Sequence, residues 1–385
     1  MTPAPTMIPA EAHHWLSARA GEMEDFLRRL VEIDSNSHDK VGVDAVGAAL
    51  AAMLEADGIT VQRIGNDTYG DVLRAEIPGQ GAPVLLLGHR DTVFPKGTVS
   101  GRGYSRDGDI AYGPGVADMK GGLVVSAFVM RALKAAGGTG FPVVALFTAD
   151  EEIGSPSGRA VIEAQAKGAR AAFNTEPGRV SGNVVTSRKG GLTLNLIAEG
   201  RAAHSGVNHA DGASAIGALA AKIVKLHALT DYQSGITTNV GVIHGGHAHN
   251  IVADHAEAEL DIRFIALAQL DDLLPRIEAI LAAPDVPDTR VSSVHGAQFM
   301  PLEERHSAEL FERYRQAAAV VGFAVDGEFT GGCADSGFTA SLGVPSLCGL
   351  GPVGGKAHTD REFCRLDTLL PRAQALALSI ATLPV

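Results

Sequence analysis

Apolar residues follow two different periods along the chain, and each period predicts one kind of element. Apolar spacing of three to four predicts helices over residues 10–32, 43–57, 123–136, 160–166, 307–321 and 367–381. Short apolar runs predict strands over residues 60–64, 71–77, 84–87, 141–147 and 171–173. Because most of these strands alternate with helices, we expect an α/β domain in which parallel pairing predominates.

A second pattern occupies residues 187–297. Alternating apolar positions predict strands over residues 191–200, 235–245, 251–264 and 289–295, and helical spacing predicts helices over residues 213–228 and 268–282. This βαββαβ order is typical of ferredoxin-like α+β domains, and its length suits a self-contained unit. We therefore predict a first domain in two segments, 1–186 and 298–385, with an inserted domain over 187–297.

Composition narrows the class of protein. The chain has 385 residues, more than a single core holds, and a net charge of −12, which argues against nucleic acid or an anionic membrane as the main partner. Its three cysteines lack the spacing of a zinc ribbon or a disulfide scaffold. With no apolar run of signal or membrane length, we expect a cytoplasmic protein.

The candidate chemistry begins where the strand at residues 84–87 ends. His89 and Asp91 are two residues apart, so on an extended backbone their side chains point the same way. A histidine that binds a metal through one ring nitrogen needs its other N–H group held, and a carboxylate does this. A polar loop leaving the sheet is the alternative explanation of this pair.

Three further acidic segments follow predicted loops or strands. Asp118 ends a Gly/Pro-rich loop just before the helix at 123–136, where capping that helix is its alternative role. Glu151 and Glu152 follow the strand at 141–147, and Glu176 follows the strand at 171–173. Open α/β sheets place their sites beyond such carboxyl ends, and adjacent carboxylates repel one another unless cations or solvent relieve them.

Together with one distant histidine, these residues form a set of metal ligands that suits a pair of zinc ions. The set is His89, Asp118, Glu152, Glu176 and His358. Two Zn²⁺ ions carry four positive charges, which three carboxylates and one bridging hydroxide would balance. Asp118 would then bridge the ions, and Glu151, beside a ligand, would be the base that is not itself a ligand.

Five segments carry a resemblance to a known family. They are His89-Arg90-Asp91-Thr92-Val93, Gly113-Pro114-Gly115-Val116-Ala117-Asp118-Met119-Lys120-Gly121-Gly122, Asp150-Glu151-Glu152-Ile153-Gly154-Ser155, Glu176-Pro177 and Ala357-His358. In order and content they resemble the motifs of the dinuclear-zinc peptidases. That family contains carboxypeptidase G, acetylornithine deacetylase, succinyl-diaminopimelate desuccinylase and aminoacylase.

The resemblance implies a zinc-binding catalytic domain with a mixed, mostly parallel sheet between helices, and an inserted ferredoxin-like lid that forms a homodimer. It implies two Zn²⁺ per chain, replaceable by Co²⁺ or Mn²⁺. One ion would bind His89, Asp118 and Glu176, and the other Asp118, Glu152 and His358. Asp91 would orient His89, Glu151 would be general base and acid, and the Asp118-Met119 peptide would be cis.

Three positions of the lid also match the family. His204 resembles the histidine that reaches the scissile carbonyl of the other subunit, and Asn250 and Arg263 resemble the residues that bind the substrate carboxylate. Arg188 and Lys189 could add positive potential near the site. The histidines at 244, 247, 249 and 255 could form another metal site, but interspersed glycines and the lack of nearby carboxylates favour a solvated turn.

We therefore expect a hydrolase that cleaves an amide bond next to a free carboxylate, namely a carboxypeptidase that releases an amino acid such as glutamate from N-acyl or peptidyl substrates. An N-acyl-amino-acid deacylase would need the same metals. Gly or Thr is usual at the position of Cys333 in the carboxypeptidase branch, so this residue argues against assigning a narrow substrate. The alternative outside the enzymes is a binding protein that has the same fold and no activity. Such a protein would not need Glu151 as a base.

Overall fold

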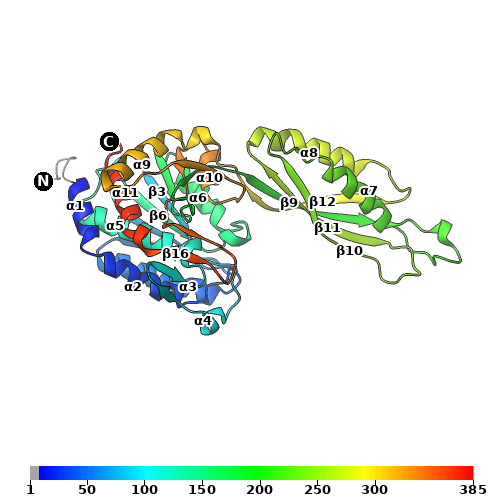
Figure 1. Ribbon diagram of the computed structural model, residues 1–385. Coiled ribbons are helices and arrows are strands. Elements are labelled where there is room, and N and C mark those ends of the chain that lie inside the picture. Colours follow the sequence, from blue (N-terminus) through cyan, green and yellow to red (C-terminus); the bar gives the residue numbers. More distant parts are fainter. Residues whose placement is uncertain (1–7, 385) are drawn as a thin grey trace. The chain divides into compact units, whose positions relative to one another are not determined.

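The computed structural model describes residues 8–384, which divide into two compact units (Figure 1). The first unit contains the described residues up to Arg188, the segment Leu302–Thr330 and the described residues from Ala334 onward. The second contains Lys189–Pro301 and Gly331–Cys333. Between residues 8 and 384, no helix combines the length and apolarity needed to cross a bilayer.

A six-stranded sheet organises the first unit. Its order is β1 (Thr60–Ile64), β2 (Val72–Ile77), β6 (Val143–Thr148), β3 (Val84–His89), β7 (Ala171–Asn174) and β14 (Ser346–Leu347). The pairs β6/β3, β3/β7 and β7/β14 are parallel, whereas β1/β2 and β2/β6 are antiparallel. The prediction of a mixed, mostly parallel sheet is therefore confirmed.

Helices α3 (Lys40–Ala56), α5 (Gly122–Ala135), α9 (Ala308–Val321) and α10 (Ser336–Ser341) contact strands of this sheet. The first unit also contains α1 (Ile8–Ser17), α2 (Ala20–Val31), α4 (Thr98–Gly101), α6 (Gly158–Ala166) and α11 (Leu369–Ala381). Every residue of β3 and of β6 is buried, as their continuous apolar runs predict. Helix α5 is buried from Gly122 to Leu133 and contacts both strands.

One predicted helix is wrong in detail. The apolar pattern over residues 10–32 predicts a single helix, but the structure has α1 and α2 with a break at Ala18 and Arg19. Arg19 has φ −127° and ψ 17°, outside the helical region, so the hydrogen-bond ladder stops there. Both helices keep an apolar stripe in the core, and the periodicity alone does not reveal the break.

Short strands in glycine-rich segments were missed. A small antiparallel sheet has the order β15 (Gly354–Gly355), β16 (Phe363–Arg365), β5 (Ile110–Tyr112) and β4 (Ser105–Asp107). Another parallel pair joins β8 (Val184–Arg188) to β13 (Gly327–Thr330). These strands are short, and most of them lack the continuous apolar run that marked the short strand β7, so the pattern does not distinguish them from loop.

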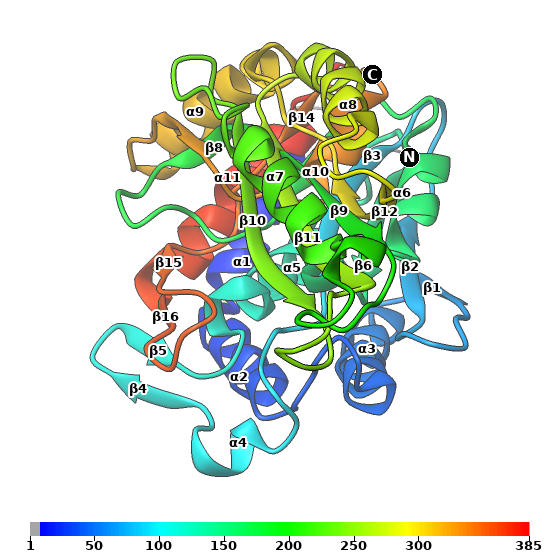
Figure 2. The same ribbon diagram turned by 90° about the vertical axis from the view of Figure 1, so that its right-hand side faces the viewer.

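The second unit is a four-stranded antiparallel sheet covered by two helices. Its strand order is β10 (Thr237–Gly245), β11 (His255–Phe264), β9 (Gly190–Glu199) and β12 (Arg290–Phe299). Helices α7 (Ala215–His227) and α8 (Leu267–Ala282) lie on the same face of this sheet (Figures 1 and 2). Leu192, Leu194 and Leu196 point into the core beneath them. The predicted ferredoxin-like order is confirmed.

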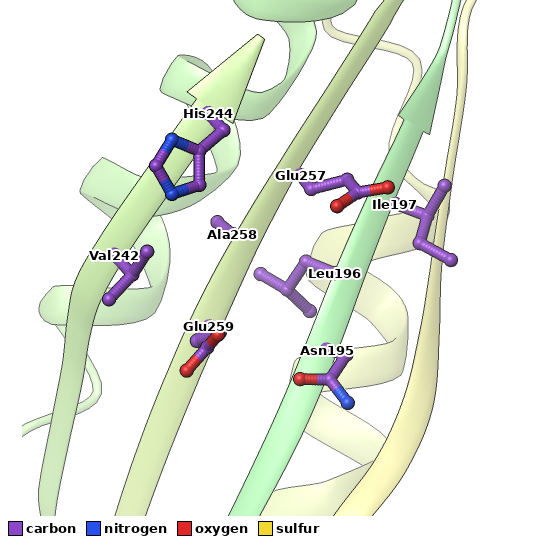
Figure 3. A pocket seen from close by; sticks show the side chains of 8 residues that line it. All are labelled: Asn195, Leu196, Ile197, Val242, His244, Glu257, Ala258 and Glu259. Atoms are coloured by element: carbon purple, nitrogen blue, oxygen red, sulfur yellow. The ribbon is translucent and has the colours of Figure 1, made fainter.

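The other face of this sheet carries polar residues. In β11 exposed and buried residues alternate from His255 onward, so His255, Glu257 and Glu259 share the uncovered face. A pocket of about 160 Å³ lies there, lined in part by Asn195, His244 and Glu257 (Figure 3).

Candidate metal centre

The candidate site lies where three parallel strands of the first unit end. His89 is the last residue of β3, Glu151 and Glu152 form a single turn after β6, and Glu176 follows β7. Because β6, β3 and β7 are neighbours and parallel, their carboxyl ends meet at one edge of the sheet. The tertiary fold thus collects side chains that the sequence spreads over almost ninety positions.

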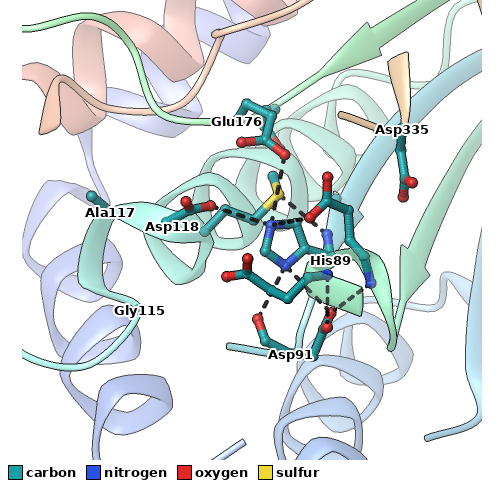
Figure 4. A network of polar contacts seen from close by, with 12 residues as sticks. His89, Asp91, Gly115, Ala117, Asp118, Glu176 and Asp335 are labelled. Carbon is teal, nitrogen blue, oxygen red and sulfur yellow. Dashed lines mark hydrogen bonds and ion pairs between the residues drawn. The ribbon is translucent and has the colours of Figure 1, made fainter. Parts of the chain in front are cut away.

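His89 is at the centre of this cluster and is only 1% exposed (Figure 4). Its Nε2 atom lies 3.3 Å from Oδ1 of Asp118, 3.6 Å from Oε1 of Glu176 and 3.9 Å from Oε2 of Glu151. Its Nδ1 atom faces Asp91, at 3.0 Å from the carbonyl oxygen and 3.4 Å from Oδ1. One ring nitrogen therefore faces carboxylates, and the other is held by Asp91.

Asp91 holds more than the imidazole. Its fully buried carboxylate accepts the Ser37 hydroxyl at 2.7 Å and the backbone N–H groups of Glu151 and Glu152 at 3.2 and 3.1 Å. A residue after β3 therefore also positions the turn after β6. Ser37 was not predicted, since no periodicity or motif connects it with Asp91.

Asp118 joins two histidines and does not cap a helix. It lies in the irregular turn Val116–Gly121, and its peptide bond to Met119 is cis, as the resemblance implies. Helix α5 begins at Gly122 without a side-chain cap, so the capping alternative is wrong. Instead Oδ1 of Asp118 faces His89, while Oδ2 lies 3.5 Å from Nε2 of His358.

His358 and Glu152 form the other end of the cluster. Nε2 of His358 lies 3.0 Å from Oε2 of Glu152. The second carboxylate oxygen of Glu152, Oε1, is buried and has no hydrogen-bond partner among the described residues. A buried oxygen without a hydrogen-bond partner destabilises the folded protein, and binding a cation would remove this destabilisation.

The described chain contains two groups of residues whose candidate ligand atoms, within each group, all lie within 4.8 Å of one another. They are His89, Asp118 and Glu152, and His89, Glu151 and Glu176. Imidazole and carboxylate donors in this mixture fit zinc and similar divalent ions. Glu151 belongs to the second group, so proximity alone does not separate a base from a ligand at this position.

The shifted pKa values of the acidic and histidine side chains in this site also indicate that it can bind a cation. Hydrogen bonds to Asp118 and Glu152 raise the pKa of His358 to about 10. Burial, and next the negative charge of Asp118, raises the pKa of Glu176 to about 7. Burial raises the pKa of Glu151 well above its usual value, and neighbouring carboxylates add to the shift. Crowded acids that retain protons are typical of sites that exchange those protons for metal.

Other buried polar residues support the site and were not predicted. Asp335 is 2% exposed and accepts the hydroxyl groups of Ser155 and Thr148 at 2.5 and 3.1 Å. Arg188, for which we considered only a general positive potential, lies with Nη1 3.9 Å from Oε2 of Glu176. Arg188 also donates to Sγ of Cys348 at 3.3 Å.

His204, Asn250 and Arg263 all belong to the second unit. The backbone near His204 pairs with that near Asn250, since Ser205 N–H donates to the carbonyl of Asn250 at 2.9 Å. Both side chains are exposed. Arg263 in β11 donates from Nε to both carboxylate oxygens of Asp261 at 3.0 Å, and from Nη1 to Sγ of Cys333 at 2.8 Å.

The exposed histidines of the second unit do not form a third group of ligands among the described residues. One reason given for excluding them was wrong, because carboxylates are near. Nε2 of His255 lies 2.8 Å from Oε1 of Glu257, and Nε2 of His247 lies 3.6 Å from Oδ1 of Asp254. These pairs are solvated surface contacts, each with two partners only.

Comparison with known proteins agrees with this geometry. A family model described as "Peptidase family M20/M25/M40" matches residues 85–382. Carboxypeptidase G2 of Pseudomonas sp. (strain RS-16) is 28% identical over 362 residues, which cover 91% of this chain and 86% of that protein. A succinyl-diaminopimelate desuccinylase of Cupriavidus taiwanensis is 30% identical over 285 residues, covering 69% of this chain and 72% of that protein.

Among solved structures, a metallo-carboxypeptidase from Sulfolobus solfataricus has a similar fold. The TM-score is 0.77 at 18% identity, and the match covers 94% of this chain and 98% of that one.

Proposed function

Because the chain belongs to peptidase family M20/M25/M40, we propose that this metallopeptidase is a carboxypeptidase that cleaves an amide bond next to a free carboxylate. Its substrates would be N-acyl or peptidyl amino acids, with glutamate as the favoured residue released. The observation that carries the proposal is the clustering of two histidines and four carboxylates at one sheet edge, in a chain similar to carboxypeptidase G2 over 91% of its length.

In this proposal Asp118 is a ligand of both zinc ions, and Co²⁺ or Mn²⁺ could replace the zinc. His89, Asp118 and Glu176 would hold one ion, and Asp118, Glu152 and His358 the other. The two carboxylate oxygens of Asp118 face different histidines, which supports this division. When bound, such ions polarise a carbonyl group and lower the pKa of water.

Glu151 supplies the proposed proton transfer. Its carboxylate takes a proton from the attacking water and then delivers that proton to the nitrogen of the leaving amino acid. Burial raises the pKa of Glu151, which suits a carboxylate that must accept a proton before delivering it. Asp91 keeps Nδ1 of His89 engaged, so that Nε2 remains directed at the carboxylates.

We propose that the second unit binds the substrate carboxylate and forms the interface of a homodimer. Arg263 and Asn250 would bind the substrate carboxylate, and His204 would reach the scissile carbonyl of the partner subunit. Strand β10 is at the edge of its sheet, and Val242 and Ile243 on this strand are 40% and 47% exposed. An apolar sheet edge of this kind supports pairing with a second copy.

The similarity to a succinyl-diaminopimelate desuccinylase favours one second candidate, an N-acyl-amino-acid deacylase. Both reactions use the same metal ligands and base. A non-catalytic binding protein would not need the buried Glu151 beside the ligand set. For the compartment we propose the cytoplasm, since Cys333, Cys348 and Cys364 form no disulfide.

Product identification tests the proposal. Zinc-loaded protein is incubated with a panel of dipeptides, N-acyl glutamates and other N-acyl amino acids, and the released amine is identified. Release of glutamate from several acyl donors is expected. Cleavage that depends on one acyl group, with little selection among amino acids, would favour the deacylase instead.

Subunit mixing tests the role of His204. His204→Ala and Glu151→Gln proteins, each of low activity, are mixed and allowed to exchange subunits. If His204 acts across the dimer, one site of each mixed dimer regains both groups and activity returns. Exchange without recovery would restrict His204 to its own chain.

A further inference from the structure

Glu362 has a fully buried carboxylate that binds the turn carrying Asp118. Its Oε1 atom accepts the N–H groups of Ala117 and Asp118, both at 2.9 Å, and Oε2 accepts that of Gly115 at 3.1 Å. Gly115 directly precedes this turn, and Ala117 and Asp118 lie in it (Figure 4). A single side chain therefore binds three backbone donors in and just before the turn that contains Asp118, a proposed shared ligand.

Glu362 also lies at the end of the loop that carries His358. That loop leads into β16, whose residue Phe363 pairs with Tyr112, the last residue of β5. The segment that leads to the turn with Asp118 leaves β5 at Tyr112, so both loops are anchored on one pair of strands. The Glu362 side chain then connects the two loops just beyond that pair.

The backbone of the His358 loop needs such an anchor. His358 has φ +63° and Lys356 has φ +54°, a conformation that residues other than glycine adopt rarely. Such residues persist where surrounding contacts hold them. Within the loop, the Thr359 hydroxyl donates to the carbonyl of Lys356 at 2.7 Å, and the Glu362 N–H donates to the carbonyl of Thr359 at 3.3 Å.

We propose that Glu362 is a positioning residue that sets Asp118 and His358 at the separation required by the metal ion they share with Glu152. The inference rests on the proposed function for the presence of that ion. Glu362 touches neither substrate nor metal in this role and acts through the backbone of the two loops. Residues behind the ligands typically change metal affinity by ~10- to 100-fold when they are replaced.

Glutamine and aspartate separate the features of this side chain. Glu362→Gln keeps the shape, but its NH₂ group must face a backbone N–H donor, so at least one of the three hydrogen bonds is lost. Glu362→Asp keeps the charge but is one methylene shorter and cannot reach all three donors. Glu32→Gln is the matched control, because Glu32 accepts the N–H group of Tyr104 at 2.7 Å in a segment without a candidate ligand.

Stepwise titration of the metal-free proteins with Zn²⁺ against a competing chelator measures each ion separately. For Glu362→Gln we expect one Kd to rise ~10- to 100-fold, with a smaller change for the ion that keeps His89 and Glu176. Glu362→Asp should change in the same direction, and Glu32→Gln should match the wild type. The visible absorption of the Co²⁺-loaded Glu362 variants should change as well.

Other results would overturn the inference. A lower melting temperature with both Kd values unchanged would make Glu362 a purely structural residue. Wild-type affinity in Glu362→Asp would mean that negative charge alone is required. Failure of the wild type to bind two ions would instead contradict the proposed function, whatever the variants do.

Discussion

Oδ2 of Asp91 accepts the backbone N–H group of Glu152 at 3.1 Å. This bond joins the segment after β3 to the turn after β6, so the position of a proposed ligand depends on a residue outside the proposed ligand set. The same carboxylate faces Nδ1 of His89 at 3.4 Å. Asp91 therefore links two proposed ligands that belong to different ions.

Asp91→Asn should weaken zinc binding by ~10- to 100-fold while the protein stays folded. Its NH₂ group would oppose one of the two backbone donors, and its neutral amide would hold His89 less strongly. Chelator competition measures the affinity, with Asp57→Asn as control, since Asp57 pairs with Arg131 at 2.5 Å. Unchanged affinity would limit Asp91 to a minor role.

Glu151→Gln should lower kcat by ~10²- to 10⁴-fold and leave two metal ions bound, because it removes proton transfer without removing a ligand. Elemental analysis of the purified protein gives the metal content. Glu163→Gln is a control on α6, where Glu163 pairs with Arg159. Loss of one ion from Glu151→Gln would show that Glu151 is a ligand.

Metal binding should release protons, and affinity should rise with pH. In the metal-free protein, hydrogen bonds to Asp118 and Glu152 raise the pKa of His358 to about 10, which favours the protonated imidazole at pH 7. A metal ion binds the neutral ring and must displace that proton. Calorimetry at pH 7 in buffers of different ionisation enthalpy measures the release. Equal heats in all buffers would contradict this role of His358.

Gly122→Ala should destabilise the protein. A Cβ atom at Gly122 would lie 1.8 Å from the carbonyl oxygen of Thr175, so α5 or the segment leading to Glu176 must move. Overpacking of this kind costs about 1–3 kcal/mol. Urea unfolding of the metal-free protein measures the loss.

Gly21→Ala provides the control, since nothing lies within 4 Å of the added Cβ. This change in α2 should be neutral or stabilising, by up to about 1 kcal/mol. Equal stability of the two variants would mean that α5 adjusts at no cost.

Arg263→Lys should raise KM for substrates with a free carboxylate by ~10-fold or more. Lysine keeps the charge but loses the planar fork, which Asp261 and Cys333 already orient from two sides. Asn250→Ala should have a smaller effect, because it removes a neutral hydrogen bond. Esterifying that carboxylate should abolish the difference between wild type and Arg263→Lys. If the wild type hydrolyses ester and acid equally, the carboxylate binds elsewhere.

The sequence by itself determined the two architectures and the residues at the strand ends. Continuous apolar runs mark β3 and β6, alternation marks β9 and β11, and these patterns survive folding because each reflects burial of a local surface. The candidates His89, Glu151, Glu152 and Glu176 followed, since parallel strands bring their carboxyl ends together.

Only the tertiary structure decided which residues support that cluster. Ser37 reaches Asp91, Asp335 reaches Ser155, and Glu362 reaches the turn of Asp118, each from a distant part of the chain. The break between α1 and α2 and the short strands β5 and β16 also escaped prediction. Contacts of this kind depend on the packing of remote segments, and a local pattern of apolar and polar residues carries no record of which segments will meet.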